Sequence, residues 1–128
     1  MSFSILIVDD EPDIADLFRQ RFRREVRQGQ YVLHFADSGE EALCRLAEIR
    51  PELIVILSDI NMPGMDGLEL LRKVKGLRPE LPVLMVTAYG DDERRHRADE
   101  LGAAAFLSKP VDFDDLKQQL VELMRPMD

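Results

Sequence analysis

The sequence contains a single cysteine, Cys44, in 128 residues, so the chain cannot form an internal disulfide bond. It has no apolar run close to the roughly 20 residues that a membrane-spanning helix needs. Its first residues lack the basic stretch of a secretory signal peptide. These absences argue against a secreted or membrane protein and indicate a cytoplasmic one. Because Cys44 lies between Leu43 and Leu46 in a predicted helix, we expect it to be a buried structural thiol.

Positive charge is also scarce, because 17 Lys and Arg residues face 25 Asp and Glu residues, for a formal net charge of −8. Such a surface repels nucleic-acid phosphates, so we expect no direct nucleic-acid binding unless basic residues share one face. Five arginines do gather near the end of a predicted helix: Arg19, Arg21, Arg23, Arg24 and Arg27. Cations suit the dipole at that end, which favours a solvated helix end, with docking of a protein partner as the alternative.

The length of 128 residues fits one compact domain covering 1–128. Apolar runs predict five strands, at 4–8, 31–36, 53–58, 82–87 and 104–108. Helical patterns lie between them, at 13–27, 39–49, 67–76 and 91–101, with a last helix after Asp112. The first and third runs do not alternate with polar residues, which is typical of parallel strands buried on both faces. The pattern predicts an α/β, flavodoxin-like, doubly wound (βα)5 domain. Its five-stranded parallel sheet would have the order 2-1-3-4-5, with helices on both faces.

The helix expected at 91–101 differs from the others because residues 91–97 are all charged or histidine. Only Ala98 and Leu101 can pack against a core. Weak anchoring places this segment at the low-stability end of the fold, where a switching element is expected.

Polar residues stand at four strand ends, where ligands bind in this kind of sheet. They are Asp9 and Asp10 after the first strand, Asp59 after the third, Thr87 ending the fourth and Lys109 after the fifth. Taken singly, each has an ordinary explanation as a helix cap, a strand end or a solvent-facing lysine. Taken together, they would require four coincidences at one edge of the sheet.

Three carboxylates in one crevice repel each other unless a proton or a cation relieves them. Oxygen ligands in an open site favour Mg²⁺, with Mn²⁺ as an alternative ion. A carboxylate is also a nucleophile towards phosphorus, and phosphoryl transfer needs cations and hydroxyl donors around the phosphoryl oxygens. The strand ends therefore predict a phosphoryl-binding site.

Four segments carry a resemblance to a known family: ILIVDDE at 5–11, SDINMPGMDG at 58–67, VTA at 86–88 and SKP at 108–110. In this order and spacing they resemble the motifs of response-regulator receiver domains in two-component, phosphorelay signal transduction, which include the chemotaxis regulators. The resemblance covers essentially the whole chain. It implies a phospho-acceptor protein whose only catalysis is its own phosphorylation and dephosphorylation.

The resemblance also implies a role for each acidic residue. Asp59 would be the phosphoacceptor. Asp10 and Asp59 would bind Mg²⁺ through their carboxylates, Asn61 through its backbone carbonyl and Asp9 through water.

Further roles follow from the other segments. Thr87 and Lys109 would contact the phosphoryl group, and the Lys109–Pro110 peptide would be cis. Tyr89 and Ala88 would lie at the rim of the site, where Tyr89 either shields the phosphoryl group from water or is an ordinary surface aromatic.

Signal output in the family involves the Thr87 position and an aromatic residue on the fifth strand, here Phe106. A core role for Phe106 is a nearly equal alternative to a switch. The phosphodonor would be a sensor histidine kinase or a phosphotransfer protein. The 91–125 face would control a downstream protein or output domain, and it could also form a homodimer.

Three other protein classes fit less well. A phosphomonoester hydrolase with an Asp nucleophile usually has a second Asp two residues later, where this chain has Asn61, and usually carries a cap domain. A flavin-binding electron carrier would need a phosphate loop where Asp9 and Asp10 stand. A degenerate receiver that only binds partners would not keep Asp59, Thr87 and Lys109 together.

Overall fold

The computed structural model describes residues 3–48, 53–87 and 91–124. The strands are β1 (Phe3–Val8), β2 (Tyr31–Ala36), β3 (Leu53–Asp59), β4 (Val83–Thr87) and β5 (Ala105–Ser108). The helices are α1 (Pro12–Arg21), α2 (Arg23–Arg27), α3 (Gly39–Glu48), α4 (Gly67–Leu77), α5 (Asp92–Glu100) and α6 (Phe113–Met124). None of the helices in the described ranges has the length and apolar character needed to cross a membrane.

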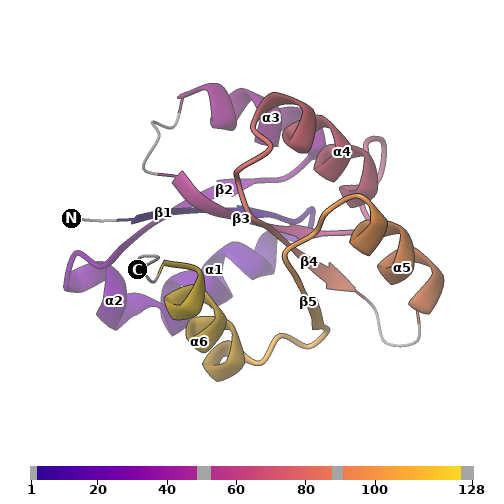
Figure 1. Ribbon diagram of the computed structural model, residues 1–128. Coiled ribbons are helices and arrows are strands. Elements are labelled where there is room, and N and C mark those ends of the chain that lie inside the picture. Colours follow the sequence, from indigo (N-terminus) through magenta and orange to yellow (C-terminus); the bar gives the residue numbers. More distant parts are fainter. Residues whose placement is uncertain (1–2, 49–52, 88–90, 125–128) are drawn as a thin grey trace.

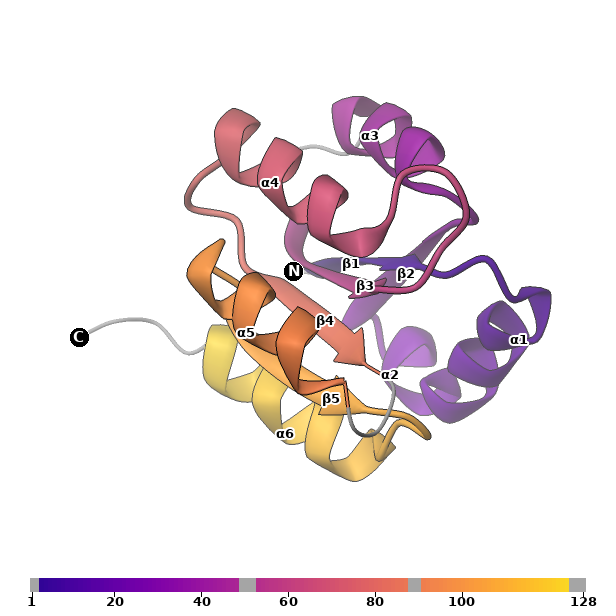
Figure 2. The same ribbon diagram turned by 90° about the vertical axis from the view of Figure 1, so that its right-hand side faces the viewer.

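The five strands form one parallel sheet in the order β2-β1-β3-β4-β5, which confirms the predicted α/β fold and strand order (Figure 1). Helices α3, α4 and α5 cover one face, and α1, α2 and α6 cover the other (Figures 1 and 2). The order brings β1 and β3 together at the centre, so the residues that follow these two strands meet at the same edge of the sheet.

The central strands are buried on both faces, as their unbroken apolar runs predict. Along β1, Leu6 and Val8 belong to the core cluster beneath α3 and α4, whereas Ile5 and Ile7 belong to the cluster beneath α1 and α6. All four residues are at most 3% exposed. Successive side chains of a strand point to opposite faces, so an unalternated run is what two covered faces require.

The prediction of a single helix at 13–27 is wrong, because the chain forms two helices separated at Phe22. The backbone of Phe22 (φ −104°, ψ 13°) departs from helical values. Its ring is fully buried and stacks on Phe18 with a centroid distance of 5.9 Å, and it meets Tyr31 edge-on. The break at Phe22 thus accompanies burial of an aromatic cluster, which helical periodicity does not reveal.

The prediction of a buried Cys44 is also wrong, because this thiol is exposed. Helix α3 buries Ala42 and Leu46, which lie one turn apart. Cys44 is two residues from each of them and therefore projects from the opposite side of the helix.

Side-chain caps fix where several helices begin. The Ser38 hydroxyl accepts the backbone N–H of Glu41 at 3.1 Å, while the Glu41 carboxylate accepts the N–H of Asp37 at 3.2 Å. Asp66 Oδ1 accepts the N–H of Glu69 at 2.9 Å at the start of α4. This last cap sets the end of the loop that follows Asp59.

Helix α5 is as poorly anchored as its sequence predicts, since Ala98 alone is buried among its nine described residues. The five arginines of the basic cluster are all exposed, in agreement with a solvated helix end.

Candidate functional site

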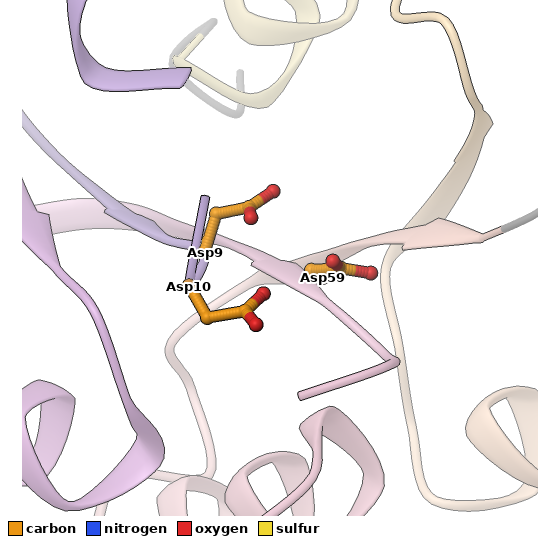
Figure 3. Close-up of side chains that lie close together, drawn as sticks. All are labelled: Asp9, Asp10 and Asp59. Atoms are coloured by element: carbon orange, nitrogen blue, oxygen red, sulfur yellow. The ribbon is translucent and has the colours of Figure 1, made fainter. Parts of the chain in front are cut away.

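Three carboxylates from two neighbouring strands converge at the carboxyl edge of the sheet (Figure 3). Asp9 and Asp10 follow β1, and Asp59 ends β3. Each offers one oxygen, and these oxygens all lie within 4.8 Å of one another. Asp9 is half-buried, Asp10 is exposed and Asp59 is only 2% exposed. The cluster is therefore a crevice with a buried floor and an open mouth.

Both carboxylate oxygens of Asp59 have partners. Oδ1 accepts the backbone N–H of Asn61 at 3.1 Å. Oδ2 accepts from the ammonium of Lys109 at 2.8 Å. The same ammonium lies 4.0 Å from a carboxylate oxygen of Glu11, so one cation faces several acidic side chains.

The pKa values reflect this excess of negative charge. Burial raises the pKa of Asp9 to about 6, and the nearby Asp59 charge adds to the effect. Burial by itself lowers the pKa of Lys109, but its hydrogen bond to Asp59 and the surrounding carboxylates outweigh burial and raise it. Three carboxylate oxygens that lie within 4.8 Å of one another are suitable ligands for a hard divalent cation such as Mg²⁺. Such a cation would also offset the negative charge that disfavours ionisation of Asp9.

Two further predicted residues lie at the neighbouring strand ends. Thr87 ends β4 and is 4% exposed, and its carbonyl accepts the backbone N–H of Lys109 at 3.0 Å. Thr87 pairs in register with Ser108, the last residue of β5. The Lys109–Pro110 peptide is cis, as the resemblance implies. Ala88 and Tyr89, predicted at the rim, lie outside the described residues.

Comparison with known proteins agrees with this geometry. A family model described as the response regulator receiver domain matches residues 5–121. The chain belongs to the response regulator receiver domain family. Members of this family are signalling phospho-acceptors, so the receiver takes part in phosphorylation-dependent signalling in two-component systems and is not a conventional enzyme.

The curated relatives of this receiver differ in length. Sporulation initiation phosphotransferase F of Bacillus subtilis is 35% identical over 117 residues, which cover 91% of this chain and 90% of that protein. Response regulator MprA of Mycobacterium tuberculosis is 34% identical over 125 residues, which cover 98% of this chain but 52% of MprA. The chain thus spans about half the length of MprA.

Solved structures resemble the receiver along nearly its full length. A response regulator receiver domain protein from Clostridium thermocellum matches with a TM-score of 0.86 and 27% identity, covering 95% of this chain and 94% of that one. The Vibrio cholerae chemotaxis protein CheY4 matches with a TM-score of 0.82 and 28% identity, covering 97% and 100%.

The chain returns close to the receiver's sheet at Gly67, the first residue of α4. A Cβ atom at this position would lie 2.3 Å from the carbonyl oxygen of Asp59 and 2.7 Å from the Cα of Ile60. The Gly67 N–H also donates to the Ile60 carbonyl at 2.8 Å. Close backbone contact therefore requires glycine at position 67. The sequence alone did not decide between this role and that of an ordinary residue between loop and helix.

Phe106 is half-buried on β5 and packs against the core cluster beneath α3 and α4. The guanidinium of Arg95, on α5, lies 5.0 Å from the centroid of its ring. This contact connects the aromatic residue of the predicted switch to α5, a helix in which Ala98 alone is buried.

One site neighbour escapes sequence reasoning. The guanidinium of Arg94, on α5, donates through Nη1 to the side-chain oxygen Oδ1 of Asn61, 33 residues earlier. Within the charged run at 91–97, no feature of the sequence distinguishes Arg94 from its neighbours, so the contact emerges only from the fold.

Proposed function

We propose that Asp59 accepts a phosphoryl group from a phosphohistidine of a sensor histidine kinase or phosphotransfer protein, in a reaction that requires Mg²⁺. The modified receiver then changes its 91–125 face and controls a downstream protein or output domain. The observation that carries the proposal is the convergence of the Asp9, Asp10 and Asp59 oxygens within 4.8 Å, with the Lys109 ammonium on Asp59.

Each group has a task in this reaction. An oxygen of Asp59 attacks phosphorus, and the bond from phosphorus to the donor's imidazole nitrogen breaks. Lys109, whose ammonium contacts Asp59, would pair with the negative phosphoryl oxygens, and Thr87 would offer a hydroxyl at the end of the adjacent strand. A cation held by Asp10, Asp59 and the Asn61 carbonyl, with Asp9 acting through water, would neutralise phosphoryl oxygens when bound.

A groove beside the site supports docking of a protein donor. It has a volume of about 380 Å³ and runs from Asp9 and Lys109 along α1 and the segment before α6. Apolar side chains form much of its lining: Ile14, Leu17, Phe18, Val111 and Phe113. A partner helix with an apolar face would fit such a surface and bring its histidine to Asp59.

Incubation with acetyl phosphate and Mg²⁺, followed by intact mass measurement, tests the proposal. We expect a gain of one phosphoryl group in the wild type, none in Asp59→Asn, and none when EDTA removes divalent ions. Asp16→Asn is the matched control, because the Asp16 side chain is 83% exposed and pairs only with Arg19 among the described contacts. Mn²⁺ should replace Mg²⁺.

Two outcomes of this experiment would contradict the proposal. No mass gain with acetyl phosphate or with a phosphorylated histidine protein would overturn the proposal. Steady release of phosphate from a general phosphomonoester would favour a hydrolase instead.

A further inference from the structure

Arg94 connects α5, in which Ala98 alone is buried, to the proposed phosphorylation site. Its Nη1 donates to Oδ1 of Asn61, whose own backbone N–H donates to Oδ1 of Asp59 at 3.1 Å. Two successive hydrogen bonds thus lead from the α5 side chain to the carboxylate that would be modified. The Arg94 guanidinium also forms an ion pair with Asp91, in which Nε lies 3.8 Å from the carboxylate oxygen Oδ2.

This connection matters because α5 has few other attachments. Ala98 is its one buried residue among the nine that form it, all of them described. Arg95 lies over the ring of Phe106 at 5.0 Å, and the N–H of Arg94 is capped by Asp91 at 3.4 Å. A helix with so little buried apolar surface opens or shifts at low cost, so one charge-assisted hydrogen bond has a measurable effect on it.

We propose that Arg94 is a positioning residue through which α5 responds to the phosphorylation state of Asp59. In the unmodified receiver, Arg94 holds α5 against the loop after β3 by its contact with Asn61. Modification of Asp59 draws the guanidinium away from Asn61 and towards the phosphoryl oxygens, and α5 moves with it. This inference rests on the proposed modification of Asp59.

The physical basis is competition for one guanidinium. A neutral amide oxygen is a weaker acceptor than a phosphoryl oxygen, and arginine is the side chain best suited to phosphoryl groups. The phosphoryl group itself carries a charge of about −1.5 to −2 at neutral pH, in place of the single negative charge of the carboxylate, so modification makes the site more negative. Asn61 stands two residues from Asp59, so the new charge would appear next to a contact that Arg94 already makes.

Amide hydrogen exchange across residues 92–100 tests the inference. The receiver is compared unmodified and with Mg²⁺ and beryllium fluoride, which imitates a phosphoryl group on a carboxylate. In the unmodified state, Arg94→Ala should speed exchange in α5 by about fivefold, the size expected for one lost hydrogen bond. The further change that beryllium fluoride causes in the wild type should largely disappear in this variant.

Two matched variants make the test specific. Arg97→Ala removes an exposed arginine from the same helix and should leave both measurements as in the wild type. A double-mutant cycle compares Asn61→Ala, Arg94→Ala and the double variant by the rate of amide hydrogen exchange in α5 of the unmodified receiver. The two effects should be non-additive, because each substitution removes the same contact. Arg94→Lys should recover part of the response to beryllium fluoride, since it keeps the charge without the planar fork.

The outcomes separate this inference from the proposed function. Mass gain at Asp59 in Arg94→Ala, together with a full wild-type response of α5, would overturn the role of Arg94 alone. Additive effects of the two single variants would overturn the Asn61 contact as its route. If the wild type itself gains no mass and shows no response, the proposed function fails, and the sensing role of Arg94 fails with it.

Discussion

The ammonium of Lys109 lies 2.8 Å from Oδ2 of Asp59, although the two residues are 50 positions apart in the chain. Asp59 is only 2% exposed, whereas the Lys109 side chain is 33% exposed. The lysine therefore approaches a buried carboxylate from the open side of the crevice. In this position it pairs with the Asp59 carboxylate and faces the place where, under the proposed function, a phosphoryl group would be added.

Replacing Lys109 with alanine should slow phosphoryl uptake from acetyl phosphate by about 100-fold, since mutational loss of one preorganised donor typically has an effect of this size. Lys109→Arg should recover only part of the rate, because the guanidinium has a different shape. The measurement is a time course of intact mass. Lys73→Ala removes a surface lysine paired with Glu69 at 3.8 Å and serves as the control. Equal rates for Lys109→Ala and the control would contradict the assigned role.

The acidic cluster should limit stability when no cation is bound. Burial and the Asp59 charge disfavour the ionised form of Asp9, so Asp9→Asn should raise the free energy of unfolding in EDTA. We expect about 1 kcal/mol, discounted because Asp9 is partly exposed to solvent. Saturating Mg²⁺ should shrink or reverse the gain, since an ion that binds only the folded state stabilises the wild type. Urea unfolding measures both effects.

The exposed Asp16→Asn variant is the control for this prediction and should change stability by less than about 0.5 kcal/mol. A metal-free Asp9→Asn protein that is no more stable than the wild type would show that neither burial nor the Asp59 charge penalises the Asp9 carboxylate appreciably.

The position of the site was predictable from the sequence because it depends on topology alone. Asp59 ends a strand, Asp9 and Lys109 each directly follow one, and the carboxyl ends of parallel strands lie at one edge. The strand limits were also predictable to within one residue, because buried parallel strands form apolar runs between polar ends.

Features that depend on tertiary packing were not predictable. The break at Phe22 follows from an aromatic cluster that includes Tyr31, and the exposure of Cys44 follows from which side of α3 faces the sheet. The Arg94 contact depends on where α5 lies relative to the loop that carries Asn61. Local patterns do not contain the relative placement of distant elements.

Two glycines of helix α4 should respond in opposite ways to the same substitution. In Gly67→Ala, the new methyl group would meet backbone atoms of Asp59 and Ile60 at 2.3 and 2.7 Å, and backbone cannot move aside cheaply. We expect a loss of about 3 kcal/mol or more in the free energy of unfolding. In Gly76→Ala, nothing lies within 4 Å of the new atom, and the helix should gain about 0.5–1 kcal/mol.

Urea unfolding of the two variants, measured side by side, checks this prediction. Because the Gly67 contact lies next to Asp59, Gly67→Ala should also reduce phosphoryl uptake, whereas Gly76→Ala should not. A Gly67→Ala protein as stable as the wild type would mean that the loop after β3 can move away from the sheet.

A partly buried ion pair far from the site should make stability depend on pH. Lys117 Nζ lies 2.9 Å from Oε2 of Glu25 and also donates to the carbonyl of Arg21 at 2.8 Å. Burial alone would raise the pKa of Glu25, but the hydrogen bond and charge of Lys117 outweigh it and hold the pKa below its usual value of 4.5. The pair therefore contributes stability above pH 4.5, and this contribution is lost as the pH falls through the lowered folded-state pKa.

Replacing Glu25 with glutamine should thus lower the free energy of unfolding by about 1 kcal/mol at pH 7, the upper end for a partly exposed ion pair. The difference from the wild type should narrow below pH 4.5, where the wild-type carboxyl group is protonated when unfolded. Glu80→Gln, which changes an exposed carboxylate, should follow the wild type at every pH. A Glu25→Gln deficit that stays constant from pH 7 to pH 3 would mean that Glu25 acts through packing, because lost packing does not titrate with its carboxyl group.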